Sequence, residues 1–151
     1  MKIVSILSIC SILFSCAIKH TASTTGDSSD STDKPQDMTI TAVIGEKPKT
    51  SDPFTISSVS VDGNIMTVEV TYGGGCKDHS FQMIGSSTIA KSMPAIRSIQ
   101  LSHVSNGDEC KKMLIQKLKI DISALAYKQT SGSEIYLALE GWTEKIKYAY
   151  K

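Results

Sequence analysis

The sequence predicts an all-β protein, an antiparallel immunoglobulin-like β-sandwich of about seven or eight strands. From residue 38 onward, apolar and polar residues alternate in short runs, which is the period of a half-buried strand. Turn residues separate these runs at short intervals, as in sandwiches. No window carries an apolar stripe over three helical turns. Because 151 residues suit one domain, we expect a single sandwich over residues 38–151.

The expected strands can be justified in chain order. The second and third flank Asp62-Gly63-Asn64, a hairpin signal because Gly and Asn tolerate positive φ. Residues 109–117 could begin as a helix, but the alternation after them favours a strand. The third strand has one apolar face, made of Met66, Val68, Val70 and Tyr72. We expect strands at residues 39–44, 54–61, 65–72, 79–83, 99–103, 114–122, 135–139 and 146–150.

The amino terminus has the layout of a secretory signal. Lys2 is the only charge before residue 19, and an apolar run of about 12 residues follows it. A membrane-spanning helix needs roughly 20 such residues. The segment Leu13-Phe14-Ser15-Cys16 then resembles the bacterial lipobox, although Phe14 is larger than the usual residue. We expect a signal peptide over residues 1–15 and a diacylglyceryl anchor on Cys16; the alternative is an ordinary secretory signal.

Residues 16–37 are expected to be the lipidated cysteine and a flexible linker. Ser, Thr and Asp dominate residues 20–33, which therefore cannot bury enough apolar surface to offset the entropy of ordering. We expect the chain in the bacterial cell envelope. Ala17 and Ile18 stand where an Asp marks inner-membrane retention in enterobacterial systems, so the outer membrane is favoured, facing the periplasm or the surface.

Composition and missing motifs exclude several functions. Net charge is +1 without a basic block, so we expect no nucleic-acid partner. The sequence has no Gly-x-Ser-x-Gly elbow, phosphate-binding loop or His-Glu-x-x-His motif. We therefore expect a monomeric, non-enzymatic protein without a required cofactor. Trp142, after Gly141, is assigned to the core rather than to a binding contact.

The four cysteines divide by compartment. Cys10 leaves with the signal peptide and Cys16 takes the lipid. Cys76 and Cys110 remain outside the cytoplasm, where two thiols most simply form a disulfide. The alternative is a pair of metal ligands.

The disulfide would bring two histidines together. Bonded cysteines have Cα atoms within about 7 Å of each other, and His79 and His103 lie close to them in sequence. By strand parity both rings point toward the core. One interpretation is a pair of buried, hydrogen-bonded histidines.

Two sharper hypotheses use the same histidines. The first is a zinc or copper site at His79 and His103, with an oxygen ligand from Asp78, Asp108 or Glu109. The second is a hydrolase in which one of the histidines is the general base. The spacing matches no established ligand motif.

Three ordered motifs resemble a group of small bacterial envelope lipoproteins of unknown function. The motifs are Gly74-Gly75-Cys76-x-x-His79, His103-x-x-Asn106-Gly107-Asp108-x-Cys110 and Leu118-x-Ile120-Asp121-Ile122-Ser123-x-Leu125. The resemblance covers roughly residue 65 to the carboxyl terminus and implies no activity. The group has an acidic residue where this chain has Val104, which removes one oxygen ligand from the metal hypothesis.

A more distant resemblance is to the carboxyl-terminal β-sandwich of NigD-like lipoproteins of Bacteroidetes. The leading hypothesis is a lipid-anchored binding or structural module. A further class is an inhibitor or adhesion module that works through exposed loops.

Overall fold

The structure, a computed structural model, describes residues 36–151. The expected signal peptide (1–15), the anchor at Cys16 and all but the end of the linker (16–37) lie outside the described residues. The first strand begins at Gln36, two residues before the expected start of the domain.

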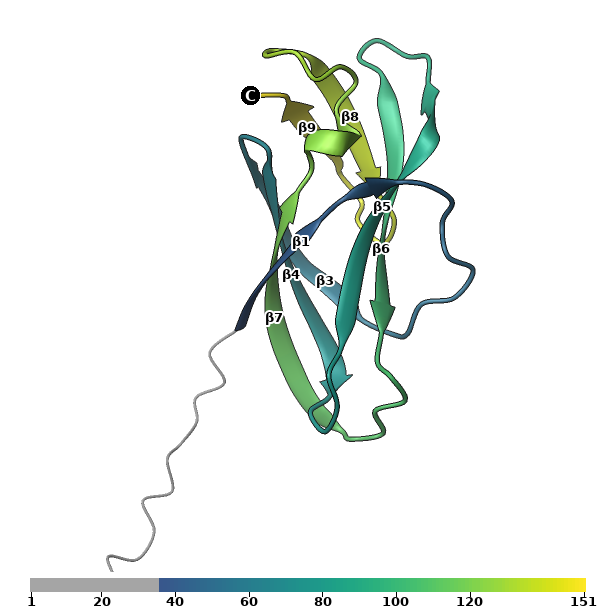
Figure 1. Cartoon of the computed structure of the whole chain (residues 1–151), viewed down its shortest axis with the longest axis vertical. Coiled ribbons are helices and arrows are strands. Elements are labelled where there is room, and N and C mark those ends of the chain that lie inside the picture. Colours follow the sequence, from purple (N-terminus) through teal and green to yellow (C-terminus); the bar gives the residue numbers. More distant parts are fainter. Residues whose placement is uncertain (1–35) are drawn as a thin grey trace, which may run out of the picture. The chain divides into compact units, whose positions relative to one another are not determined.

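The described residues form nine strands in two sheets that pack face to face (Figure 1). The first sheet has the order β1-β7-β4-β3, and the second has the order β2-β5-β6-β8-β9. A short 3-10 helix at Ser123–Leu125 follows β7. No helix among residues 36–151 is long and apolar enough to cross a membrane. The strands are β1 (Gln36–Thr41), β2 (Val43–Ile44), β3 (Thr55–Asp62), β4 (Ile65–Gly74), β5 (Ser80–Ala90), β6 (Ile96–Val104), β7 (Lys112–Asp121), β8 (Glu134–Leu139) and β9 (Lys145–Ala149).

The all-β sandwich is confirmed, but its sheets are mixed rather than purely antiparallel. Strand pairs β1–β7, β2–β5 and β6–β8 run parallel. The run expected as one strand at residues 39–44 divides at Ala42, where the chain passes from the first sheet to the second. Ala42 is buried, and its N–H donates to the carbonyl of Asp121 at 2.8 Å. Alternation reports which face is buried and not strand direction, so the sequence pattern could not reveal this.

The core lies between the two sheets and follows the predicted alternation. The expected apolar face of β4 is buried along its length. The β3–β4 hairpin is confirmed, and Gly63 takes a φ of +58° in its turn. Trp142 is partly buried against the core, as expected. Opposite the β4 face, the second sheet contributes buried Ile99, Leu101, His103, Ile135, Leu137 and Leu139.

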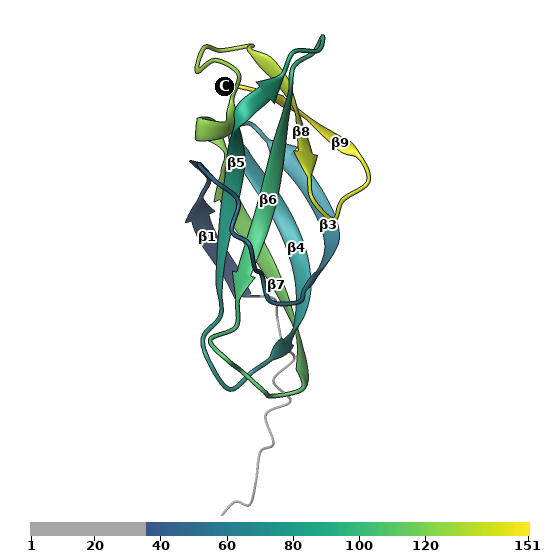
Figure 2. The same ribbon diagram turned by 90° about the vertical axis from the view of Figure 1, so that its right-hand side faces the viewer.

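Two connections lie side by side at one end of the sandwich (Figure 2). Residues 75–79 join β4 to β5, and residues 105–111 join β6 to β7. Each connection passes from one sheet to the other. We call it the disulfide end, and it holds the candidate residues.

Candidate functional site

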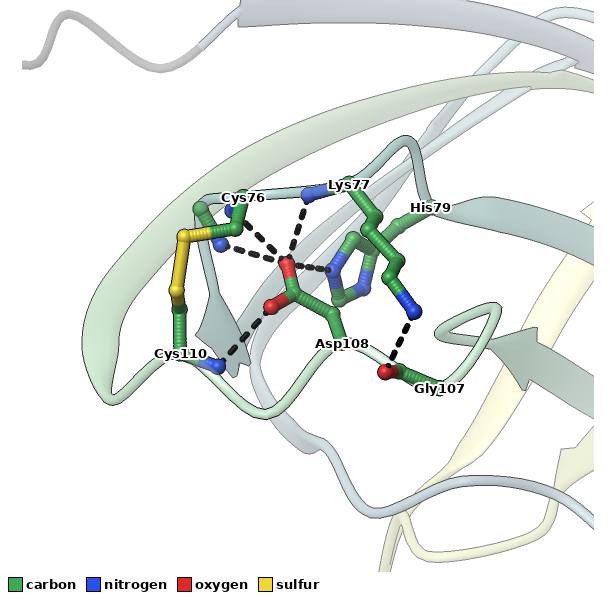
Figure 3. The surroundings of a disulfide bond; sticks show 7 residues. Cys76, Lys77, His79, Gly107, Asp108 and Cys110 are labelled. Carbon is green, nitrogen blue, oxygen red and sulfur yellow. Dashed lines mark hydrogen bonds and ion pairs between the residues drawn. A yellow bond between two sulfur atoms is a disulfide. The ribbon is translucent and has the colours of Figure 1, made fainter.

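A disulfide joins the two connections. Cys76 and Cys110 are bonded, with their Cα atoms 5.9 Å apart, which confirms the predicted pairing (Figure 3). Their sulfurs and a carboxylate oxygen of Asp108 lie within 4.8 Å of one another. Metal binding by cysteine requires a thiolate, so the oxidised pair does not offer these sulfurs as charged ligands.

Asp108 is the central acceptor of the disulfide end (Figure 3). Its Oδ2 accepts hydrogen bonds from the backbone N–H groups of Gly75, Cys76 and Lys77 at 2.8–2.9 Å. Its Oδ1 accepts the N–H of Cys110 at 2.9 Å. The side chain has no exposed surface. Successive N–H groups that converge in this way form an anion-binding nest, here filled by a carboxylate of the same chain.

These hydrogen bonds keep the carboxylate charged. The N–H of Cys110, followed by those of Cys76 and Lys77 and by the His79 ring, holds the pKa of Asp108 far below its ordinary value of 3.8. Burial acts in the opposite direction and is outweighed. Asp108 is therefore an anion throughout the physiological range.

His79 links this carboxylate to the second histidine. Its Nε2 lies 3.1 Å from Oδ2 of Asp108, and its Nδ1 lies 2.8 Å from Nε2 of His103. Only 3% of the His79 side chain is exposed. Gly74 leaves room for the ring, because a Cβ at that position would overlap Nε2 and lie 2.6 Å from Cε1.

The direction of the hydrogen bond between the two rings depends on the tautomer that each ring adopts. When a neutral His79 donates its Nε2–H to the carboxylate, its Nδ1 is the acceptor for Nε2–H of His103. The remaining nitrogen, Nδ1 of His103, is buried without a hydrogen-bond partner among the described residues.

His103 is neutral and packed among rings. Burial, foremost, lowers its pKa. Its ring stacks against Phe81 at a centroid distance of 4.5 Å and against His79 at 5.0 Å, with Tyr72 at 4.9 Å. The sequence prediction that both histidine rings face the core is confirmed, since only 2% of His103 is exposed.

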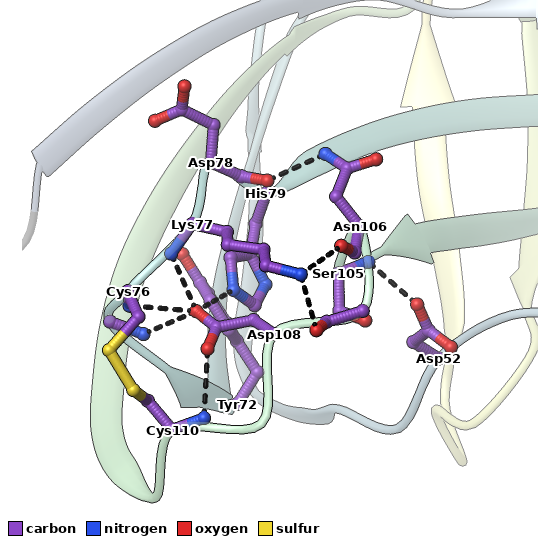
Figure 4. Close-up of polar contacts among 12 residues, drawn as sticks. Asp52, Tyr72, Cys76, Lys77, Asp78, His79, Ser105, Asn106, Asp108 and Cys110 are labelled. Carbon is purple, nitrogen blue, oxygen red and sulfur yellow. Dashed lines mark hydrogen bonds and ion pairs between the residues drawn. A yellow bond between two sulfur atoms is a disulfide. The ribbon is translucent and has the colours of Figure 1, made fainter.

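Further contacts fix the two connections to each other (Figure 4). Lys77 Nζ donates to the carbonyls of Asn106 and Gly107 at 3.1 and 2.8 Å. The side-chain amide of Asn106 donates to the carbonyl of Asp78 at 2.7 Å. The Asn-Gly pair takes φ values of +53° and +67°, which suit these residue types. The disulfide is thus one of several links between the connections.

Few ligand atoms at the disulfide end are free to bind a metal ion. Both oxygens of Asp108 and both ring nitrogens of His79 already have partners. The free imidazole nitrogen of this set is Nδ1 of His103. The other candidate oxygen donors, Asp78 and Glu109, are exposed. An ion that used both histidines would have to break the hydrogen bond between them.

The arrangement also lacks a nucleophile for hydrolysis. Across residues 36–151, no Ser, Thr or Tyr hydroxyl is hydrogen-bonded to either imidazole. Tyr72 packs against both rings, but its hydroxyl donates to Gln116 at 2.6 Å. An activated nucleophile requires a base within hydrogen-bond reach, and neither histidine supplies that contact.

Sequence reasoning missed what Asp108 does. It appeared as a possible metal ligand, whereas its partners are backbone N–H groups of a glycine-led turn and of Cys110. One local signal was present. Asp108 lies two residues before Cys110, and a side-chain oxygen that accepts the N–H two residues later forms an Asx turn. The long-range contacts to residues 75–77 have no such signal.

Comparison with known proteins gives a fold and no family. No family model matches the chain, and no curated protein matches it. Three similar solved structures are from Bacteroidetes: a NigD-like immunity protein from Bacteroides caccae (TM-score 0.54, 18% identity), a putative toxin-related protein from Parabacteroides distasonis (0.52, 13%) and a protein of unknown function from Bacteroides vulgatus (0.52, 9%).

Each of these likenesses is partial. They cover 73%, 74% and 78% of this chain, whereas the chain spans only 58%, 61% and 58% of theirs. The expected likeness to NigD-like proteins is therefore confirmed at the level of the fold.

Proposed function

We propose that this chain is a lipid-anchored, non-enzymatic module of the bacterial cell envelope that binds a partner through its exposed loops. One observation carries the proposal. In the network of Asp108, His79 and His103, every side-chain oxygen and nitrogen except one has a partner within the network or on the backbone. A network whose polar atoms already have partners holds the two connections together rather than forming a reactive centre. We call this network of Asp108, His79 and His103 the clamp.

A clamp of this kind favours binding by the loops it holds. Lys77, Asn106 and Gly107 are exposed, and hydrogen bonds fix them at the disulfide end. A loop that is already ordered loses less conformational entropy when a partner binds. The rigid end therefore supports a binding role without supplying any reaction.

The amino-terminal sequence supports the anchor. Leu13-Phe14-Ser15-Cys16 follows a charged start and a short apolar run. Acyl chains on Cys16 would hold the domain at the membrane, because each buried CH₂ contributes about 0.8 kcal/mol. The linker of residues 16–37 would let the domain extend away from the membrane surface.

A metal site is the second candidate. The observation in its favour is the unpaired, buried Nδ1 of His103. Zinc sites use three or four protein ligands, and one free nitrogen is far from that number. We therefore rank the metal site below the clamp.

Metabolic labelling with radioactive palmitate tests the anchor. We expect the wild-type chain to carry label when it is produced in a bacterium with the lipoprotein pathway, and Cys16→Ser to carry none. Cys10→Ser is the matched control, since Cys10 lies within the expected signal peptide, and it should be labelled like the wild type. Equal label on wild type and Cys16→Ser would refute the anchor.

A further inference from the structure

A cavity of about 360 Å³ lies where the first sheet meets the connection from β4 to β5. Three apolar side chains line it, Met38 from β1, Tyr72 from β4 and Leu114 from β7. The His79 ring forms part of its wall, but both ring nitrogens already have partners. The volume is at the small end of the range for ligand sites, so the cavity suits a small group or one residue of a peptide.

Gln116 supplies an unsatisfied donor to this cavity. Its side chain lines the cavity and is only 7% exposed. Its Oε1 accepts the hydroxyl of Tyr72 at 2.6 Å, whereas its Nε2 has no hydrogen-bond partner among the described side chains and backbone groups. A nearly buried NH₂ group has little access to water, so an oxygen atom of a ligand would satisfy it.

Two exposed carboxylates, Asp37 and Asp78, also line the cavity. The carboxylate of Asp78 has no ion pair or hydrogen bond within residues 36–151, and it points away from the other labelled side chains (Figure 4). The backbone of Asp78 is held, because its carbonyl accepts the side-chain amide of Asn106 at 2.7 Å. Asp37 forms a surface ion pair with Lys119 at 2.7 Å, which a competing cation can displace because such pairs are weak.

These charges favour an organic cation over an anion or a metal ion. Lys77 lines the cavity too, but its ammonium group already donates to the carbonyls of Asn106 and Gly107. No three carboxylate or imidazole ligand atoms converge at this cavity among residues 36–151, so a divalent ion would lack protein ligands. The cavity therefore suits a ligand that combines an ammonium group, a short apolar body and an oxygen acceptor.

We propose that this cavity binds the free amino terminus of a peptide. The α-ammonium group donates to Asp78 and Asp37, and the carbonyl oxygen of the first peptide residue accepts an N–H of Gln116. A small apolar side chain on that residue packs against Met38 and Leu114. Capture of an amino-terminal amine is a recurrent mode of peptide recognition. The inference rests on the proposed binding role and names its partner, since the clamp orders the connection that carries Asp78 and so reduces the entropy lost on binding.

NMR titration of the oxidised full chain with alanyl-alaninamide tests the inference, and the side-chain NH₂ signals of Gln116 are the readout. We expect a saturable shift of these signals. Asp78→Asn should weaken binding about fivefold, whereas Glu109→Gln should bind like the wild type, because Glu109 is an exposed carboxylate of the same end that does not line the cavity. Acetylation of the peptide amine, which removes its charge, should weaken binding at least about tenfold, and propylamine, which lacks the carbonyl, should also bind more weakly.

Three results would overturn the inference. The first is the absence of any saturable shift with alanyl-alaninamide. The second is equal affinity for the acetylated peptide or for propylamine, since the site would then not recognise the ammonium group and the carbonyl together. The third is unchanged binding by Asp78→Asn. Palmitate labelling at Cys16 is independent of all three, so failure of the peptide site and failure of the anchor are distinguishable.

Discussion

Replacement of Asp108 by asparagine is expected to lower the melting temperature by about 10 °C. The carboxylate accepts four backbone N–H groups and the ring of His79, with no exposed surface. An asparagine keeps one acceptor oxygen and turns its NH₂ group toward N–H donors. Buried donors left without acceptors are costly, and each kcal/mol lost lowers the melting temperature of a domain of this size by about 4 °C.

Asp78→Asn is the control for this prediction. Asp78 belongs to the other connection of the disulfide end and is exposed, so its substitution should change the melting temperature by no more than about 2 °C. If Asp108→Asn had the same melting temperature as Asp78→Asn and the wild type, the central role of the Asp108 carboxylate would be contradicted.

The same carboxylate predicts a pH dependence. The pKa of Asp108 is lower in the folded chain than its ordinary value of 3.8. Its contribution to stability is therefore complete above that value and is lost as the pH falls toward the folded pKa. The difference in melting temperature between wild type and Asp108→Asn should be constant above about pH 5 and narrow below about pH 4. If the difference in melting temperature between the two proteins did not narrow below about pH 4, the predicted role of the Asp108 carboxylate would be contradicted.

Loss of the disulfide is expected to lower the free energy of unfolding by about 3–4 kcal/mol. Cys76 and Cys110 are 34 residues apart, and the bond restricts the unfolded chain over that loop. The measurement is urea denaturation of a Cys76→Ala, Cys110→Ala double variant against the oxidised wild type. Wild type under reducing conditions is the control and should unfold near the double variant. A loss below about 1 kcal/mol would contradict the prediction.

The two predictions are coupled. The N–H groups of Cys76 and Cys110 both donate to Asp108, and alanine keeps these donors. The bond and the carboxylate therefore hold the same two connections. Combining their substitutions should cost less than the sum of the separate losses, because interactions in one network are not additive.

Much of the fold could be predicted from the sequence because one face of strands such as β4, β7 and β8 is buried. Period-two alternation places Met66, Val68 and Val70 in the core and turns the histidine rings inward. The Asp62-Gly63-Asn64 turn and the Cys76–Cys110 bond were likewise predictable, the turn from local chemistry and the bond from the expected compartment.

Strand direction and long-range polar partners could not be predicted in this way. The parallel pairs depend on how the chain crosses between sheets at Ala42, and alternation is the same in either direction. The nest around Asp108 joins residues 31–33 positions apart. Nothing in a single sequence identifies which backbone N–H groups a distant carboxylate will meet.

The central claim is that the histidine pair belongs to a closed clamp rather than to a metal site. Calorimetric titration of the oxidised, purified chain with Zn²⁺ and with Cu²⁺ tests it most directly. His20→Ala serves as the control, because His20 is the third histidine of the chain and lies in the expected linker. We predict that any saturable heat is lost in His20→Ala and kept in His79→Ala. Saturable binding that His79→Ala abolishes and His20→Ala preserves would contradict the clamp.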